Sequence, residues 1–143
     1  MEAKPLNVLH IEDDPEQQLV LRLLLDTAKP AGFRLVQAGT LGRGLASLVQ
    51  LPFDLLILDL HLPDSDGEAT LHSALARAGK VPIIVLSGND SDQLATQFVQ
   101  AGAQDFLVKG QINPRLLLRS INYAIERKHT AVVAFLRSVG ANE

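Results

Sequence analysis

Five polar side chains that can bind ions or act as nucleophiles stand directly behind short apolar runs of this chain. They are Glu12, Asp13, Asp59, Ser87 and Lys109. If these runs are parallel strands of one sheet, their carboxyl ends lie along the edge where such sheets bind ligands. Three carboxylates in one crevice raise one another's pKa unless a cation lies between them. Because Mg²⁺ prefers hard oxygen ligands, the sequence predicts a magnesium site at this edge.

The same residues could also accept a phosphoryl group. A Mg²⁺ ion held by few carboxylates keeps coordination positions open for a phosphate oxygen. The Lys109 ammonium and the Ser87 hydroxyl can bind other oxygens of that group. Asp59 is left as the nucleophile, because carboxylates accept phosphoryl groups as acyl phosphates. Taken alone, Asp59 could equally cap its strand or begin a turn, so this interpretation depends on the coincidence of four strand ends.

The segment 53–67, which reads FDLLILDLHLPDSDG, is the centre of the expected fold. Its uncharged run 55–58 is typical of a strand buried on both faces, and turn formers follow it. Strands and helices alternate along the rest of the chain. The strands are expected over 6–11, 33–38, 55–58, 82–86 and 104–108, and the helices over 15–29, 41–50, 68–78, about 94–99 and from 114 onward. This alternation predicts an α/β domain with a doubly wound, five-stranded parallel sheet.

Helix starts and helix faces can also be predicted. Capping residues are expected at Asp14, Thr40 and Asn113, and proline follows the first and the last of these. The apolar pattern of the first helix is Leu19, Val20, Leu23, Leu24 and Thr27. In the second helix the side chains expected to face inward are Leu41, Leu45, Leu48 and Val49. In the last helix they are Leu117, Leu118, Ile121 and Ile125.

The composition is that of a globular domain and excludes several classes of function. Apolar residues make up 47% and charged residues 20% of the chain, and the net charge of -3 gives no reason to expect nucleic-acid binding. The absence of cysteine excludes disulfides and thiolate chemistry. The four histidines lack metal-ligand spacing, and no apolar run is long enough to cross a membrane. These features predict a cytoplasmic protein.

Four motifs in a fixed order resemble the receiver domain of two-component response regulators. They are HIEDDP at 10–15, DLHLPDSDG at 59–67, LSG at 86–88 and AGAQDFLVKG at 101–110. The resemblance covers about residues 6–128 and is closest to stand-alone receivers of the chemotaxis type. It implies a flavodoxin-like fold with strand order 2-1-3-4-5, an order for which such a receiver is a known example.

The resemblance implies a role for each matching residue. Asp59 aligns with the phosphoacceptor, and Ser87 and Lys109 align with the groups that bind the phosphoryl oxygens. The implied ligands of Mg²⁺ are Glu12, Asp13, Asp59 and the backbone carbonyl of His61, with Asp13 as the direct ligand of the acidic pair. Phe106 matches the aromatic switch residue whose rotamer follows Ser87. Asp14 is assigned to helix capping rather than to the metal.

Some positions depart from the family pattern or vary within it. Gly110 follows Lys109 where the family commonly has proline, so a cis peptide bond is not carried over. Phe106 lacks the hydroxyl of the tyrosine often found at its position. His61 and Asn89 occupy positions that border the attacking water in this family. At this position His61 is as consistent with an exposed side chain that has no catalytic role as with a group that sets the rate of attack by this water.

The function implied by the resemblance is a phosphorylation-dependent signalling switch. A histidine kinase or phosphotransfer protein donates a phosphoryl group to Asp59 with Mg²⁺, and the chain catalyses only its own phosphorylation and dephosphorylation. Ser87 and Phe106 then reshape the face formed by the fourth helix, fifth strand and fifth helix. Because no output sequence appears by residue 143, the expected output is contact with an unknown downstream protein, unless the chain is the receiver fragment of a larger hybrid protein.

Other classes of function are compatible with parts of the pattern. A phosphatase would use Asp59 as a transient nucleophile, but the haloacid-dehalogenase type has a second Asp where His61 stands. A pseudo-receiver scaffold would not need the intact acid, hydroxyl and lysine set. A flavodoxin-like FMN carrier is disfavoured by the acidic edge and by an aromatic content of 4%.

The chain continues past the expected receiver domain, residues 1–128, into an expected helical extension over 129–143. The extended C-terminal helix would carry a heptad seam broken only by one lysine. The seam consists of Leu118, Ile121, Ile125, Lys128, Val132, Phe135 and Val139. We expect this surface to bind a partner or to form a homodimer. The alternative is a short extra helix that folds back on the domain.

Overall fold

A computed structural model describes residues 4–88 and 92–126 of the chain. Five parallel strands form one sheet in the order β2-β1-β3-β6-β7. The strands are β1 (Leu6–Ile11), β2 (Phe33–Ala38), β3 (Leu55–Asp59), β6 (Ile83–Ser87) and β7 (Asp105–Val108). Counted along the chain, this is the order 2-1-3-4-5, so the predicted flavodoxin-like topology is confirmed.

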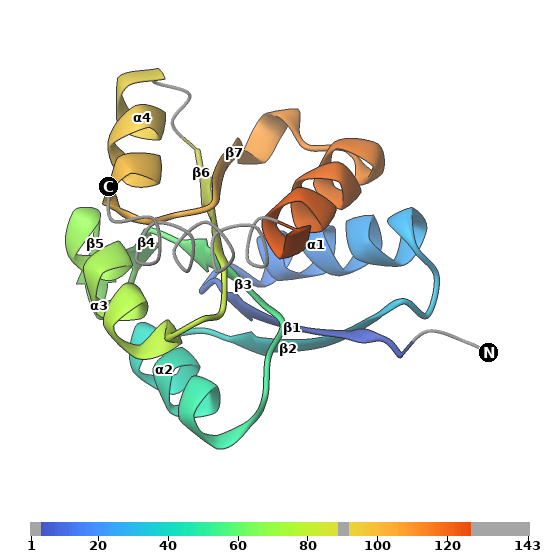
Figure 1. The fold of residues 1–143 in the computed structure, drawn as a ribbon, viewed down its shortest axis with the longest axis horizontal. Coiled ribbons are helices and arrows are strands. Elements are labelled where there is room, and N and C mark those ends of the chain that lie inside the picture. The colour runs from blue at the N-terminus through green and yellow to red at the C-terminus, as the bar shows by residue number, and fades with distance from the viewer. Residues whose placement is uncertain (1–3, 89–91, 127–143) are drawn as a thin grey trace, which may run out of the picture.

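Helices cover both faces of this sheet, as Figure 1 shows. They are α1 (Pro15–Ala28), α2 (Leu41–Gln50), α3 (Glu68–Ala78), α4 (Asp92–Ala101), a 3₁₀ turn η1 (Lys109–Gln111) and a helix that includes residues 114–126, called the last helix below. On one face α1 and the last helix share a core cluster, and on the other face α2, α3 and α4 share a second cluster. No helix within 4–88 and 92–126 combines the length and apolarity that crossing a membrane requires.

The central strand β3 is buried at all five of its positions. Leu56 and Leu58 belong to the core cluster on the α2–α3–α4 face, while Leu55 and Ile57 belong to the cluster on the α1 face. A strand that has no exposed face must be apolar throughout, which explains its uninterrupted run of leucine and isoleucine. The strand ends at the single carboxylate Asp59, which is therefore held at the edge of a fully buried element.

The predicted capping residues are confirmed. Asp14 accepts a hydrogen bond from the Glu16 N–H at 2.9 Å, and Thr40 accepts one from the Arg43 N–H at 3.2 Å. Asn113 Oδ1 accepts the N–H of Leu116 at 2.8 Å. Each bond satisfies an amide that the first turn of a helix leaves without an intrahelical partner.

The predicted inward face of α2 is wrong at one position, and the predicted pattern of α1 is only partly buried. Val49 was expected to face inward but is 69% exposed, whereas Leu41 belongs to the core cluster and Leu45 and Leu48 pack against it, as predicted. In α1, apolar residues lie on more than one side of the helix, so the pattern predicts a helix without fixing its orientation. Leu21 and Leu25 are buried, and Leu24 of the predicted pattern packs against the same core cluster, while other residues of that pattern stay exposed. These exposed side chains are Leu19, Val20 and Leu23.

The predicted helical extension over 129–143 lies outside the described residues, as do Asn89 and the seam positions from Lys128 onward. Within the last helix, Leu117 and Ile121 are fully buried and Ile125 packs against the same core cluster. The seam positions Ile121 and Ile125 are therefore used by the domain's own core, whereas Leu118, the first seam position, is half-buried and does not belong to that cluster.

Gly44 of α2 is a position where a methyl group has no space. A Cβ atom built there would lie 2.2 Å from Ile11 Cδ1, whereas Gly42 in the same helix faces open surroundings, with only Asp64 Oδ2 at 3.5 Å. We expect Gly44→Ala to lower the free energy of unfolding by about 1–3 kcal/mol, because overpacking outweighs the gain in helix propensity. Gly42→Ala, the matched control, should be neutral or stabilising by up to about 1 kcal/mol. Urea denaturation of both variants tests this, and equal effects would contradict the packing argument.

Candidate functional site

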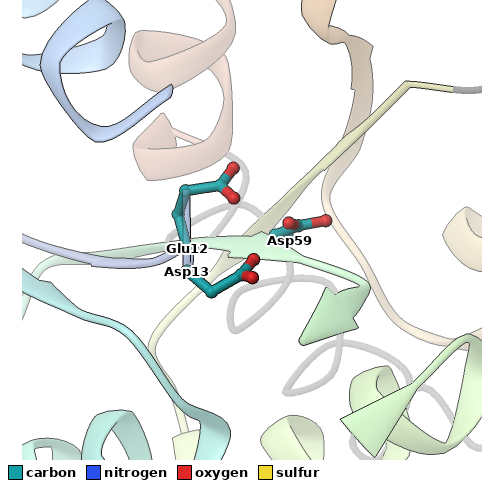
Figure 2. A group of neighbouring side chains, drawn as sticks. All are labelled: Glu12, Asp13 and Asp59. Carbon is teal, nitrogen blue, oxygen red and sulfur yellow. The ribbon is translucent and has the colours of Figure 1, made fainter. Parts of the chain in front are cut away.

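Three carboxylates converge where β1 and β3 end, as Figure 2 shows. Oxygen atoms of Glu12, Asp13 and Asp59 all lie within 4.8 Å of one another. Glu12 is 1% exposed and Asp59 is 3% exposed, while Asp13 is open to solvent. The parallel pairing of β1 with β3 produces this convergence, because the carboxyl ends of both strands reach the same edge. The grouping predicted from the sequence is therefore present.

The Lys109 ammonium lies between the two buried carboxylates. Its Nζ atom is 2.7 Å from Glu12 Oε1 and 3.2 Å from Asp59 Oδ2. The residue is the first of η1, directly after β7, so the strand at the far edge of the sheet supplies the cation. One ammonium cannot balance three carboxylates, so the cluster keeps an excess of negative charge.

Burial and the neighbouring charges both shift the pKa values of the buried groups. Burial raises the pKa of Glu12 from 4.5 to about 7; the Lys109 ammonium opposes this shift, and Asp59 adds to it. Burial lowers the pKa of Lys109, but the hydrogen bond to Glu12 and the charges of Asp59 and Glu12 outweigh it, so the net shift is upward. The site therefore favours a bound cation.

The donor set fits Mg²⁺. Glu12 Oε1 is buried and pairs with the Lys109 ammonium at 2.7 Å. The carboxylate oxygens of Glu12, Asp13 and Asp59 together match the requirement of a hard divalent ion for oxygen ligands. The ligand role predicted for the backbone carbonyl of His61 stays a prediction.

A short hairpin follows Asp59 and was not predicted. Strands β4 (His61–Leu62) and β5 (Ser65–Asp66) pair antiparallel, and the His61 imidazole contacts the Asp66 carboxylate across them. The His61 N–H also donates to Asp59 Oδ1 at 3.1 Å. Buried Thr70 anchors the hairpin because its hydroxyl donates to the Leu60 carbonyl at 3.0 Å. The turn formers of the sequence thus fix the backbone beside Asp59.

The two predicted switch residues lie near one cavity. Ser87 is 2% exposed at the end of β6 and lines a cavity of about 300 Å³ together with His61 and Phe98. The ring of Phe106 is half-buried and stacks on Phe98, with centroids 5.8 Å apart and planes 9° from parallel. The aromatic pair therefore connects β7 to the wall of the cavity that Ser87 lines.

Sequence reasoning missed a polar network beneath the acidic cluster. His10 is fully buried, and burial together with Lys109 lowers its pKa to about 3, against an opposing effect of Asp59. Gln37 Nε2 lies 3.1 Å from His10 Nδ1, and Gln18 Nε2 donates to the Glu12 carbonyl at 2.6 Å. A histidine inside the mostly apolar strand β1 was the available signal for this network.

Comparison with known proteins identifies the family. Residues 8–122 match the sequence profile of the response regulator receiver domain, which is most of the chain. The chain therefore belongs to the receiver domain family of two-component response regulators.

The curated relatives are longer regulators. The chain is 37% identical over 134 residues to the KDP operon transcriptional regulatory protein KdpE of Escherichia coli, covering 90% of this chain and 54% of that protein. It is 32% identical over 136 residues to the swarming motility regulation protein RssB of Serratia marcescens, covering 95% and 60%. The chain thus spans somewhat over half the length of these two relatives.

Solved structures of receiver domains are similar over nearly their full length. A CheY-like receiver domain from Methanospirillum hungatei is 26% identical with a TM-score of 0.75, covering 89% of this chain and 98% of that chain. The receiver domain of the sensor histidine kinase PA1611 from Pseudomonas aeruginosa is 26% identical with a TM-score of 0.72, covering 85% and 98%. That structure holds a magnesium ion in its active-site cleft.

The raised pKa of Glu12 predicts how the stability of the metal-free protein changes with pH. A carboxyl whose pKa is raised by folding contributes stability below its unfolded value of 4.5, and this contribution is lost as the pH rises through about 7. Glu12→Gln should abolish this loss and make the metal-free protein more stable than the wild type above that pH, by about 1–3 kcal/mol.

Urea denaturation in the presence of EDTA, repeated across the pH range, measures this effect. The control is Glu16→Gln, which changes an exposed glutamate in the first turn of α1. If Glu12→Gln and Glu16→Gln follow the same pH profile as the wild type, Glu12 does not carry the linkage.

Proposed function

We propose that this chain is a phosphorylation-dependent signalling switch in which Asp59 accepts a phosphoryl group from a histidine kinase or a phosphotransfer protein. The observation that carries the proposal is the buried Asp59 carboxylate with the Lys109 ammonium at 3.2 Å and two further carboxylates within 4.8 Å. A carboxylate in such a place can act as a nucleophile toward phosphorus, beside a cation that binds the developing charge.

The residues that would hold Mg²⁺ are Glu12, Asp13, Asp59 and the backbone carbonyl of His61. When bound, the ion neutralises charge on the phosphoryl oxygens and orients them for in-line transfer. An Asp59 oxygen forms the new bond to phosphorus as the bond from phosphorus to the donor breaks. The Lys109 ammonium, already beside Asp59 Oδ2, can bind one phosphoryl oxygen, and the Ser87 hydroxyl can donate to another.

The conformational response is proposed to pass through the cavity wall. When Ser87 moves toward the phosphoryl group, the packing of Phe98 and Phe106 changes, because these rings stack beside the same cavity. The change would reach α4 and β7, which carry these rings, and the last helix, which follows them in the chain. An element with two packings, biased by a local change in charge, is a common basis of such switches.

The alternative of a phosphatase with Asp59 as a transient nucleophile has less support. His61 stands two residues after Asp59, and its imidazole contacts Asp66 instead of extending the acidic cluster. We propose that the chain catalyses only its own phosphorylation and dephosphorylation.

Loss of the phosphoacceptor should abolish labelling. We expect wild-type protein to gain one phosphoryl group from acetyl phosphate in the presence of Mg²⁺ and none in the presence of EDTA. Asp59→Asn should gain none, whereas Asp26→Asn, which changes an exposed aspartate of α1, should behave as the wild type. Intact-protein mass spectrometry measures this. Equal labelling of Asp59→Asn and the wild type would refute the assignment.

Lys109 and Ser87 should act at different steps. Lys109→Ala should both slow phosphorylation and weaken the response, because no other ammonium lies against Asp59 in the described part of the chain. Ser87→Ala should accept phosphate but show small chemical-shift changes over residues 97–110. Nuclear magnetic resonance before and after phosphorylation reports both effects, with Ser73→Ala on the exposed side of α3 as the control. A full response in Ser87→Ala would contradict the coupling.

A further inference from the structure

The side chain of Gln18 bonds back past the start of α1 to the backbone of the acidic cluster. Its Nε2 atom donates to the Glu12 carbonyl at 2.6 Å, six residues earlier in the chain. A backbone carbonyl can only accept, so the nitrogen end of the amide must face Glu12. The bond lies in a partly buried place and ties the beginning of α1 to the residue that directly follows β1.

Gln18 reaches Glu12 from a backbone that is itself held in place. The Gln18 N–H donates to the Asp14 carbonyl at 2.9 Å in the first turn of α1, and the Gln18 carbonyl accepts the amide of Gln37 from β2 at 2.8 Å. The other end of the Gln37 amide accepts Arg22 Nη2 at 3.0 Å, one turn further along α1. Contacts with a second element, β2, therefore fix the base from which the Gln18 side chain extends.

The Glu12 carbonyl belongs to the peptide group that joins Glu12 to Asp13. Because peptide groups are planar, a bond to this carbonyl orients the whole plane and restricts the direction in which the Asp13 side chain leaves the backbone. The chain on either side is also held. The Glu12 N–H donates to the Ala38 carbonyl at 2.9 Å, and the Asp14 N–H donates to Glu12 Oε2 at 3.2 Å. The Gln18 bond orients the peptide group between these two contacts.

We propose that Gln18 is a positioning residue for the magnesium site and acts through the peptide group between Glu12 and Asp13. The carboxylate oxygens of Glu12, Asp13 and Asp59 must lie together to share one ion, and they are within 4.8 Å of one another. Burial and the Lys109 ammonium already hold Glu12 and Asp59. Asp13 is exposed, so its place depends on the backbone that carries it.

This inference rests on the proposed function for the identity of the ion. Groups that orient metal ligands from behind typically change metal affinity by about 10- to 100-fold when they are removed. The bond from Gln18 reaches the ligands through the backbone rather than through a ligand side chain. The effect of its loss should therefore lie at the lower end of that range.

The first test is the affinity of the full chain for Mg²⁺, read from backbone amide shifts during a titration with the ion. Gln18→Met keeps the length of the side chain but removes the donor, so it should weaken binding by about tenfold. Gln18→Asn keeps the amide but is one methylene shorter, so it should weaken binding as well. Gln50→Met makes the first change at the exposed end of α2 and should bind as the wild type. Wild-type affinity in folded Gln18→Met would overturn the proposal.

Leu25→Ala separates positioning from the general stability of α1. Leu25 is buried in the core cluster beneath this helix, so its truncation should lower the urea midpoint of unfolding. The bond from Gln18 to Glu12 is untouched, so the affinity for Mg²⁺ should stay within about threefold of the wild type. If Leu25→Ala weakens binding as much as Gln18→Met, stability alone explains the effect and the proposal is overturned.

The last measurement examines the bond without the metal. In the metal-free wild type, the side-chain amide protons of Gln18 should exchange with solvent more slowly than those of Gln50, because one of them is held by the Glu12 carbonyl. Equal exchange would overturn the proposal. If Gln18→Met weakens Mg²⁺ binding but the wild type accepts no phosphoryl group at Asp59, the proposed function fails and the role of Gln18 stands. A wild type that binds no Mg²⁺ would contradict both.

Discussion

The structure depends on an excess of negative charge at one edge of a buried sheet. Glu12 and Asp59 are almost completely withdrawn from water, and one ammonium, that of Lys109, lies against both. Removal of this ammonium would leave the buried carboxylates without a cation, which is strongly destabilising. With Asp13 beside the pair, the carboxylates outnumber the cation. Burial of Glu12, reinforced by the nearby Asp59, raises the pKa of Glu12. A bound divalent cation would offset this excess of negative charge.

The rest of the fold holds these charges at fixed places. β3 can hold Asp59 in a position shielded from water because every residue before it in the strand is buried and apolar. Behind β1, the side chains of Gln18, Gln37 and His10 connect the surface of α1 to the acidic residues. The aliphatic core therefore sets the position of the site, and the polar network joins α1 and β2 to the backbone at Glu12.

The sequence was sufficient for what depends on local pattern. Apolar runs and proline positions predict the strands and the capping roles of Asp14 and Thr40. The parallel topology predicts that Asp13 and Asp59 meet. It was insufficient where tertiary packing chooses between equivalent patterns, as in α1, where apolar residues lie on several sides.

The hairpin after Asp59 and the role of Asp64 were also missed. Asp64 accepts the N–H groups of Leu41 and Gly42 from the start of α2, and these bonds lower its pKa. That contact joins segments more than twenty residues apart, which no local pattern encodes.

The most direct test of the account is chemical trapping of the phosphorylated residue. Borohydride reduces an aspartyl phosphate to homoserine, so treatment of the protein after reaction with acetyl phosphate and Mg²⁺ marks the phosphoacceptor permanently. Peptide mass spectrometry should find homoserine at position 59 and at no other aspartate, and none when EDTA replaces Mg²⁺. Homoserine at another position, or labelling of Asp59 that does not need the metal, would contradict the account.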